Sequence, residues 1–166
     1  MRIRKARSPA SPEAARVAAL RMLERRPHAE RELARKLVLR GYERETVDGI
    51  VGRLRETGLL DDEKFARDFA RWRMSGSLEG RGILAMRLVA RGVPRKLAEE
   101  TAEAAMTNEE EADRAVTAAR KYVKRHPADD AAGRRKLYSF LARRGFPPEA
   151  IRRAVRATGV TEGDSD

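Results

Sequence analysis

Leu37-Val38-Leu39-Arg40-Gly41-Tyr42 is the first of three similar stretches in this chain. The other two are Leu88-Val89-Ala90-Arg91-Gly92-Val93 and Leu141-Ala142-Arg143-Arg144-Gly145-Phe146, and a further Leu stands four residues before each copy, at Leu33, Leu84 and Leu137. The distance is 51 residues from Gly41 to Gly92 and 53 residues from Gly92 to Gly145. A period near fifty with a helix-ending glycine indicates that one supersecondary unit occurs three times. We therefore predict an all-α, elongated solenoid of three tandem three-helix repeats, with about nine helices.

Local signals place the helices of the first repeat, residues 11–58. Ser11-Pro12-Glu13 combines an N-cap, a proline suited to the first helical position and an acid in the first turn, so a helix is expected from Pro12 to about Glu24. A second helix should run from about Ala29 to the stop at Gly41. Val47, Ile50, Val51 and Leu54 have the spacing of one buried helical face, and Gly58 ends this third helix.

The second repeat is expected over residues 59–107 and the third over 108–158. In the second, Asp61-Asp62 begins a helix on which Phe65, Phe69 and Trp72 should be buried, and 75–80 reads as a flexible linker. The next helices end at Gly92 and near Met106. In the third, 108–111 reads as a capping box, and helices follow over about 133–143 and 148–157.

The charge of the chain favours an acidic partner. The 166 residues have a net charge of +11, with 38% charged residues and a pI near 10.7. Such a balance suits nucleic acid, a nucleoprotein or an acidic protein surface, although solvated helix faces alone also produce it. Residues 1–10 are expected to form a flexible basic arm, and residues 159–166 an acidic disordered tail.

Composition also bears on the compartment. The chain has no cysteine, and no run of about 18 apolar residues follows its basic start. We expect a cytoplasmic protein without a membrane span, and a monomer, because each repeat can bury its apolar stripe against its own helices and its neighbours.

A catalytic interpretation finds little support in the sequence. The only histidines, His28 and His126, each stand beside a proline, and no His and carboxylate cluster has metal-ligand spacing. The acidic runs stand where helix N-termini favour negative charge. A glycine-rich stretch at Gly76, Gly80 and Gly82 lacks the Lys-Ser or Lys-Thr of a P-loop. We expect no enzyme activity, no cofactor and no metal.

Basic side chains are the candidate partner-binding residues. Those near the ends of the second helices recur at related repeat positions, and two more flank Trp72, which is interpreted as a core residue rather than a base-stacking platform. The alternative role for each is to stabilise the negative end of its own helix. The candidates are Lys36, Arg40, Arg71, Arg73, Arg87, Arg91, Arg143 and Arg144.

The arrangement resembles the bacterial RecX family of RecA regulators from about Ser11 to Thr158. The motifs that carry the resemblance are 32–37 (Glu-Leu-Ala-Arg-Lys-Leu) with Arg-Gly-Tyr at 40–42, and 58–66 (Gly-Leu-Leu-Asp-Asp-Glu-Lys-Phe-Ala) after Leu54. The chain departs from the family pattern at 27–29 (Pro-His-Ala), where Ser or Thr is frequent, and in the loop at 131–133.

The resemblance implies a non-enzymatic regulator in DNA repair and recombination. It would bind RecA in its nucleoprotein filament, lie in the helical groove, and lower strand exchange, ATP hydrolysis and the co-protease activity that triggers the SOS response. Its binding to bare DNA is expected to be weak and steeply salt-dependent. The alternative is a direct DNA-binding protein that uses helix pairs hinged at Gly41, Gly92 or Gly145 as helix-turn-helix units.

Overall fold

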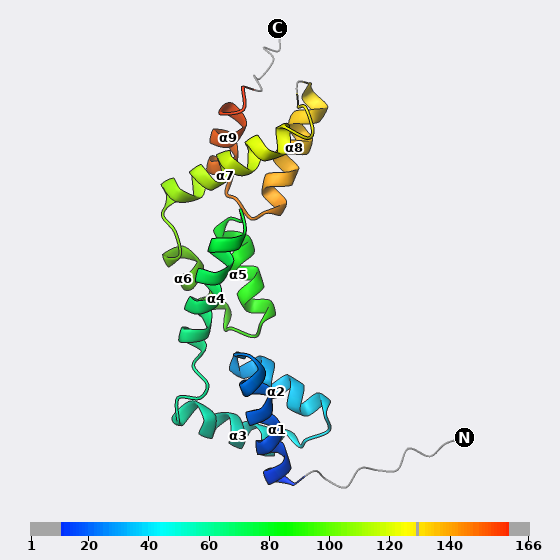
Figure 1. The fold of residues 1–166 in the computed structure, drawn as a ribbon, viewed down its shortest axis with the longest axis vertical. Coiled ribbons are helices and arrows are strands. Elements are labelled where there is room, and N and C mark those ends of the chain that lie inside the picture. The colour runs from blue at the N-terminus through cyan, green and yellow to red at the C-terminus, as the bar shows by residue number, and fades with distance from the viewer. Residues whose placement is uncertain (1–10, 129, 160–166) are drawn as a thin grey trace, which may run out of the picture. The chain divides into compact units, whose positions relative to one another are not determined.

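The structure is a computed structural model that describes residues 11–128 and 130–159. Over these ranges it contains nine α-helices and no strand (Figure 1), as predicted. In chain order they are α1 Pro12–Arg25, α2 Glu30–Leu39, α3 Arg44–Glu56, α4 Asp62–Gly76, α5 Arg81–Ala90, α6 Arg95–Ala104, α7 Asn108–Val123, α8 Ala131–Arg143 and α9 Pro148–Arg156. The predicted arm at 1–10 and almost all of the predicted tail lie outside the described residues.

The chain divides into two compact units. Unit 1 comprises the described part of Met1–Phe65 together with Ala90–Val93, and unit 2 comprises Ala66–Val89 together with the described part of Pro94–Asp166. Each predicted repeat range contains three of the helices. The repeat boundaries and the elongation of the solenoid stay predictions.

The core of unit 1 is built from the apolar faces of α1, α2 and α3. Leu37, which begins the first repeated stretch, and Leu33, four residues before it, are fully buried, as predicted. Burying a leucine side chain stabilises a fold by about 1.5–3 kcal/mol. The buried cluster comprises Ala15, Ala19, Met22, Leu33, Leu37, Val47, Ile50, Leu54 and Leu60.

Helix ends in unit 1 follow the local signals. The Ser11 hydroxyl accepts a hydrogen bond from the Ala14 amide at 3.2 Å, which satisfies one of the free donors of the first turn of α1. Gly41 has φ +91°, and the Tyr42 amide donates to the Leu37 carbonyl at 3.3 Å. This backbone turn ends α2 in the left-handed conformation that glycine adopts easily.

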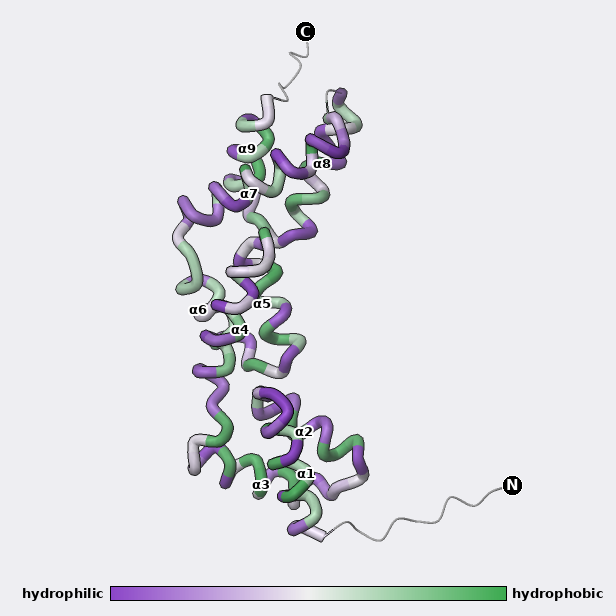
Figure 2. Tube along the Cα trace, viewed as in Figure 1, coloured by the Kyte–Doolittle hydropathy of each residue, from purple (hydrophilic) through white to green (hydrophobic). Residues whose placement is uncertain are grey.

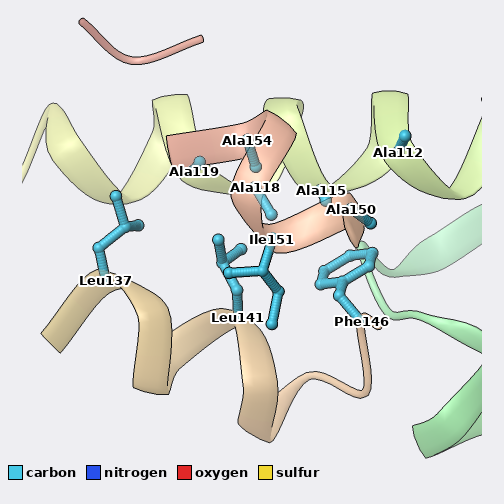
Figure 3. Close-up of a cluster of buried hydrophobic side chains, with 10 residues drawn as sticks. All are labelled: Ala112, Ala115, Ala118, Ala119, Leu137, Leu141, Phe146, Ala150, Ile151 and Ala154. Atoms are coloured by element: carbon cyan, nitrogen blue, oxygen red, sulfur yellow. The ribbon is translucent and has the colours of Figure 1, made fainter. Parts of the chain in front are cut away.

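The core of unit 2 forms where α7, α8 and α9 meet (Figure 3). Alanines on one face of α7 lie opposite Leu137 and Leu141 of α8 and Ile151 of α9, and all three of these larger side chains are at most 1% exposed. Small alanine side chains allow the neighbouring helices to approach α7 closely. Leu84 and Leu88 of α5 are likewise fully buried, as predicted.

Trp72 is a correction to the sequence prediction, because its side chain is 61% exposed. The buried residues of α4 include Ala66 and Ala70, while Phe65 is buried and Phe69 is half-buried. A helix turns about 100° per residue, so Trp72 lies about 120° around the axis from Ala66 and about 160° from Ala70. The aromatic spacing was consistent with one face, but the small alanines mark where that face is centred.

The predicted linker at 75–80 is a second correction. Ser75 and Gly76 are the last residues of α4, and the Gly80 amide donates to the Arg144 carbonyl at 2.9 Å. The Gly82 amide donates to the Gly145 carbonyl at 3.2 Å. The start of α5 is therefore held by the backbone of the turn after α8, and a side chain at Gly80 would collide with that turn, at 2.4 Å from the Gly145 oxygen.

The predicted capping box of α7 exists but begins one residue earlier. Thr107, not Asn108, is the N-cap: its hydroxyl accepts from the Glu110 amide at 3.2 Å, and its own amide donates to a Glu110 carboxylate oxygen at 2.7 Å.

Hydrophobic and hydrophilic residues are mixed along the helices (Figure 2). Of the helices described, none is long and apolar enough to cross a membrane.

Candidate functional site

Four of the eight candidate cations are held by contacts within their own unit. Lys36 Nζ lies 3.0 Å from Glu32 Oε1, while Arg73 and Arg87 lie 2.6 Å and 2.8 Å from Glu79 Oε1. Arg144 donates to the Leu78 carbonyl at 3.2 Å, and its guanidinium carbon lies 4.6 Å from the centre of the Phe140 ring. These side chains position helices as well as carrying charge.

Glu79 lies between α4 and α5 in the chain and forms ion pairs with an arginine of each helix. The sequence pattern did not predict this role. It is 7% exposed and accepts hydrogen bonds from both Arg73 and Arg87. Burial by itself would raise the pKa of Glu79, but the two guanidinium groups outweigh burial and hold this pKa below its ordinary value of 4.5. The Glu79 carboxylate is therefore ionised, and its negative charge neutralises part of the positive charge of the two arginines.

A similar cluster surrounds Glu32 at the start of α2. Arg26 Nη2 lies 2.5 Å from Glu32 Oε1, and Lys36 approaches the same oxygen. Burial would raise the pKa of Glu32, but hydrogen bonds from these two cations lower it to about 2. His28 is also buried: its Nδ1 lies 2.9 Å from the Arg26 carbonyl oxygen and its Nε2 lies 3.1 Å from Lys36 Nζ.

Three other candidates, Arg40, Arg71 and Arg143, are exposed. Arg40 is the C-cap of α2 and Arg143 is the last residue of α8, so both also complement the negative end of a helix. Arg91 is half-buried and has a partner within the chain. The exposed cations are the ones whose charge is available to a partner.

The exposed face of α4 combines charge with a large apolar side chain. Arg71 is 80% exposed, and its pair with Asp68 at 3.5 Å is an exposed contact that contributes little to stability. Trp72, beside it, stacks obliquely on Phe69 with 5.8 Å between ring centres. Arg71 also lines a cleft of about 520 Å³, together with Arg67, Ala70, Met74, Glu100, Thr101, Ala104 and Ala105. We call Arg71, Trp72 and this cleft the α4 surface.

An ion-pair network that the sequence did not suggest fixes the start of α5. Arg81 Nε lies 2.6 Å from Glu111 Oε2, and the Arg81 amide donates to Glu111 Oε1 at 2.7 Å. Arg81 also contacts Glu103 at 2.6 Å and the Asn108 side chain. Because Glu111 is only 1% exposed, the acidic run that opens α7 does more than cap its own helix.

Metal ligands do not gather in the described ranges. No group of three or more His, Asp or Glu side chains there is arranged to hold a metal ion. His28 and His126 stand in connecting segments, as predicted, and His126 is exposed after the end of α7. The fold defines an all-α helical-repeat protein.

Comparison with known proteins identifies the family. Models of the first, second and third three-helix domains of RecX match residues 15–54, 61–101 and 109–155. The chain is 39% identical over 148 residues to the regulatory protein RecX of Halorhodospira halophila, covering 89% of this chain and 90% of that one. It is 35% identical over 158 residues to the regulatory protein RecX of Mycobacterium marinum, covering 94% and 91%.

Solved structures agree on the fold. The crystal structure of RecX from Lactobacillus salivarius superposes with a TM-score of 0.78 at 22% identity, covering 90% of this chain and 97% of that one. A second RecX regulatory protein structure has a TM-score of 0.77 at 24% identity, covering 85% and 71%. This chain belongs to the RecX family of regulatory proteins.

Proposed function

We propose that this chain binds RecA and the RecA filament on DNA, and that it lowers the recombinase, ATPase and co-protease activities of RecA. Membership of the RecX family supports a regulatory role. The structural observation that carries the proposal is Trp72, a large aromatic side chain left 61% exposed beside Arg71. Trp and Arg are the residue types most enriched among the dominant contacts of protein interfaces.

A filament suits a chain with repeated units. RecA subunits present the same surface at every step of the filament, so a protein with three related three-helix repeats can contact more than one subunit. Modest affinities of the single contacts then combine. Arg40, Arg71 and Arg143 are our proposed contacts among the eight candidates. Lys36 contributes mainly through its ion pair within unit 1, and Arg73, Arg87 and Arg144 through ion pairs and a backbone contact within unit 2.

The test is RecA-dependent ATP hydrolysis on single-stranded DNA, with RecA from the same organism. The chain is expected to inhibit at concentrations below that of RecA. The double variant Arg71→Ala/Trp72→Ala should need at least about tenfold more protein for half-inhibition, because one dominant interface residue commonly contributes 2 kcal/mol or more. A double control, Met86→Ala/Arg95→Ala, removes an exposed apolar and an exposed basic side chain elsewhere in unit 2.

Two outcomes would count against the proposal. Absence of inhibition at equimolar protein would remove RecA as the partner. Equal loss of potency in the test and control variants would remove the α4 surface as the contact. The helix-turn-helix alternative predicts sequence-dependent binding to duplex DNA without RecA, and a duplex titration separates it from a filament regulator.

A further inference from the structure

A basic cleft lies within unit 2 where α7 ends and α8 packs beside it. Its volume is about 470 Å³, within the range of about 300–1,000 Å³ that is typical of small-molecule sites. Its lining residues are Lys121, Tyr122, Lys124, Arg125, His126, Phe140 and Arg144. We call it the α7–α8 cleft.

The α7–α8 cleft carries positive charge that the described residues leave unneutralised. Lys121, Lys124 and Arg125 are exposed, no carboxylate of a described residue lines the cleft, and none of the three forms an ion pair with another described residue. Elsewhere in unit 2, arginines such as Arg81 and Arg153 lie 2.6–2.7 Å from carboxylates. Part of this positive charge stabilises the negative end of α7. That effect is confined to the last turn of the helix, so it does not account for all of the charge.

An aromatic ladder forms one side of the same cleft. The Tyr122 ring centre lies 4.8 Å from that of His126 and 4.5 Å from that of Phe140. The Arg144 guanidinium covers the Phe140 ring at 4.6 Å. His126 is the exposed end of the ladder, while Tyr122 and Phe140 are half-buried against the core of unit 2.

We propose that the α7–α8 cleft binds a nucleotide unit of single-stranded nucleic acid. Lys121, Lys124 and Arg125 contact backbone phosphates, and a base stacks on the ladder at His126. Cations that follow the backbone together with aromatic rings for the bases are what sequence-tolerant single-strand binding requires. A duplex keeps its base faces stacked and out of reach, and a carboxylate partner would make no use of the rings.

This inference goes beyond the proposed function, because it concerns nucleic acid in the absence of RecA. It also differs from the helix-turn-helix alternative, which reads duplex DNA. The experiment is a fluorescence anisotropy titration of labelled oligothymidine with the full chain, over a series of salt concentrations and without RecA. Failure of this titration leaves the RecA proposal untouched, and failure of the ATPase test leaves this one untouched.

The phosphate contacts are tested by the triple variant Lys121→Ala/Lys124→Ala/Arg125→Ala. Each lost phosphate contact should reduce the slope of log affinity against log salt by about 0.7, so the slope should fall by about 2. The stacking contact is tested by His126→Ala, which should weaken binding about fivefold or more, because a stacked base is commonly worth at least that factor. Tyr122, Phe140 and Arg144 are left intact because they pack in the fold.

The matched control is Arg95→Ala/Lys96→Ala/Arg152→Ala, which removes three exposed cations from α6 and α9. Equal loss of affinity in the two triple variants would show a general charge effect and overturn the proposal. So would unchanged binding in the cleft variant, or tighter binding of polyglutamate than of the oligonucleotide through the same three residues. Free phosphate at matched ionic strength should not displace the oligonucleotide; displacement would reduce the site to a phosphate site.

Discussion

Replacing Gly145 by alanine should destabilise unit 2 far more than a left-handed backbone alone explains. Gly145 has φ +79°, and a Cβ there would stand 2.2 Å from the Ile83 amide nitrogen and 2.9 Å from the Ile83 Cβ. These atoms belong to the main chain or are attached directly to it, so they cannot move aside as the end of a flexible side chain can. The turn after α8 must therefore move away from the start of α5.

The magnitude follows from three contributions. A left-handed conformation costs an alanine about 1–2 kcal/mol. Displacing packed atoms adds about 1–3 kcal/mol. The movement also weakens the hydrogen bonds from the Gly80 and Gly82 amides, at 2.9 Å and 3.2 Å, each worth about 0.5–1.5 kcal/mol. With both hydrogen bonds lost, Gly145→Ala should thus lower the free energy of unfolding by about 3–8 kcal/mol.

Gly41 provides the matched comparison at the related position of the first repeated stretch. Its φ is +91°, but nothing lies within 4 Å of a Cβ built there. Gly41→Ala should cost only the conformational contribution, about 1–2 kcal/mol. Guanidinium denaturation followed by far-ultraviolet circular dichroism compares the variants. If both glycines cost the same, the backbone junction between α5 and the turn after α8 does not form as described.

Four further predictions concern stability. Leu37→Ala should cost about 2–5 kcal/mol in denaturant unfolding, because Leu37 is fully buried, and a parent-like midpoint would contradict its place in the core. The pKa of Glu32 is lowered to about 2, so its contribution is complete above pH 4.5 and is lost as pH falls toward 2; Glu32→Gln should be less stable than the parent at neutral pH and equal to it near pH 2. Burial and the nearby Arg26 lower the pKa of His28 below 6.5, so stability should also decline as pH falls below 6.5, and His28→Gln should remove that decline. Glu79→Gln should lower the melting temperature more than Glu149→Gln, a change at an exposed ion pair, because Arg73 and Arg87 lose a buried charge partner; equal melting temperatures would show that the Glu79 cluster adds no stability.

The helices were predictable because their ends are set by neighbouring residues. Ser11 caps α1 through an amide three residues on, and Gly41 ends α2 through a turn that involves only adjacent residues. Thr107 shows the limit of this reasoning, since two capping residues in succession leave the start of a helix uncertain by one position.

Contacts between distant segments were not predictable from local pattern. Gly80 is a linker residue by composition, and only its approach to Gly145 makes it a packing residue. Trp72 has the spacing of a buried aromatic, but the direction in which α4 packs is decided by the helices around it. Six of the eight candidate cations were placed near helix ends from sequence, and the other two were placed beside Trp72. The carboxylates that neutralise some of them, such as Glu79, are identified only by the fold.

The exposure of Trp72 gives this chain a built-in spectroscopic reporter. It is the single tryptophan of the sequence, so the intrinsic indole emission of the isolated chain comes from one point on the α4 surface. A water-exposed indole emits at longer wavelength than a covered one and is readily quenched by iodide. A tryptophan-free partner that covers α4 would therefore shift the emission to shorter wavelength and shield it from the quencher, without any label on the protein.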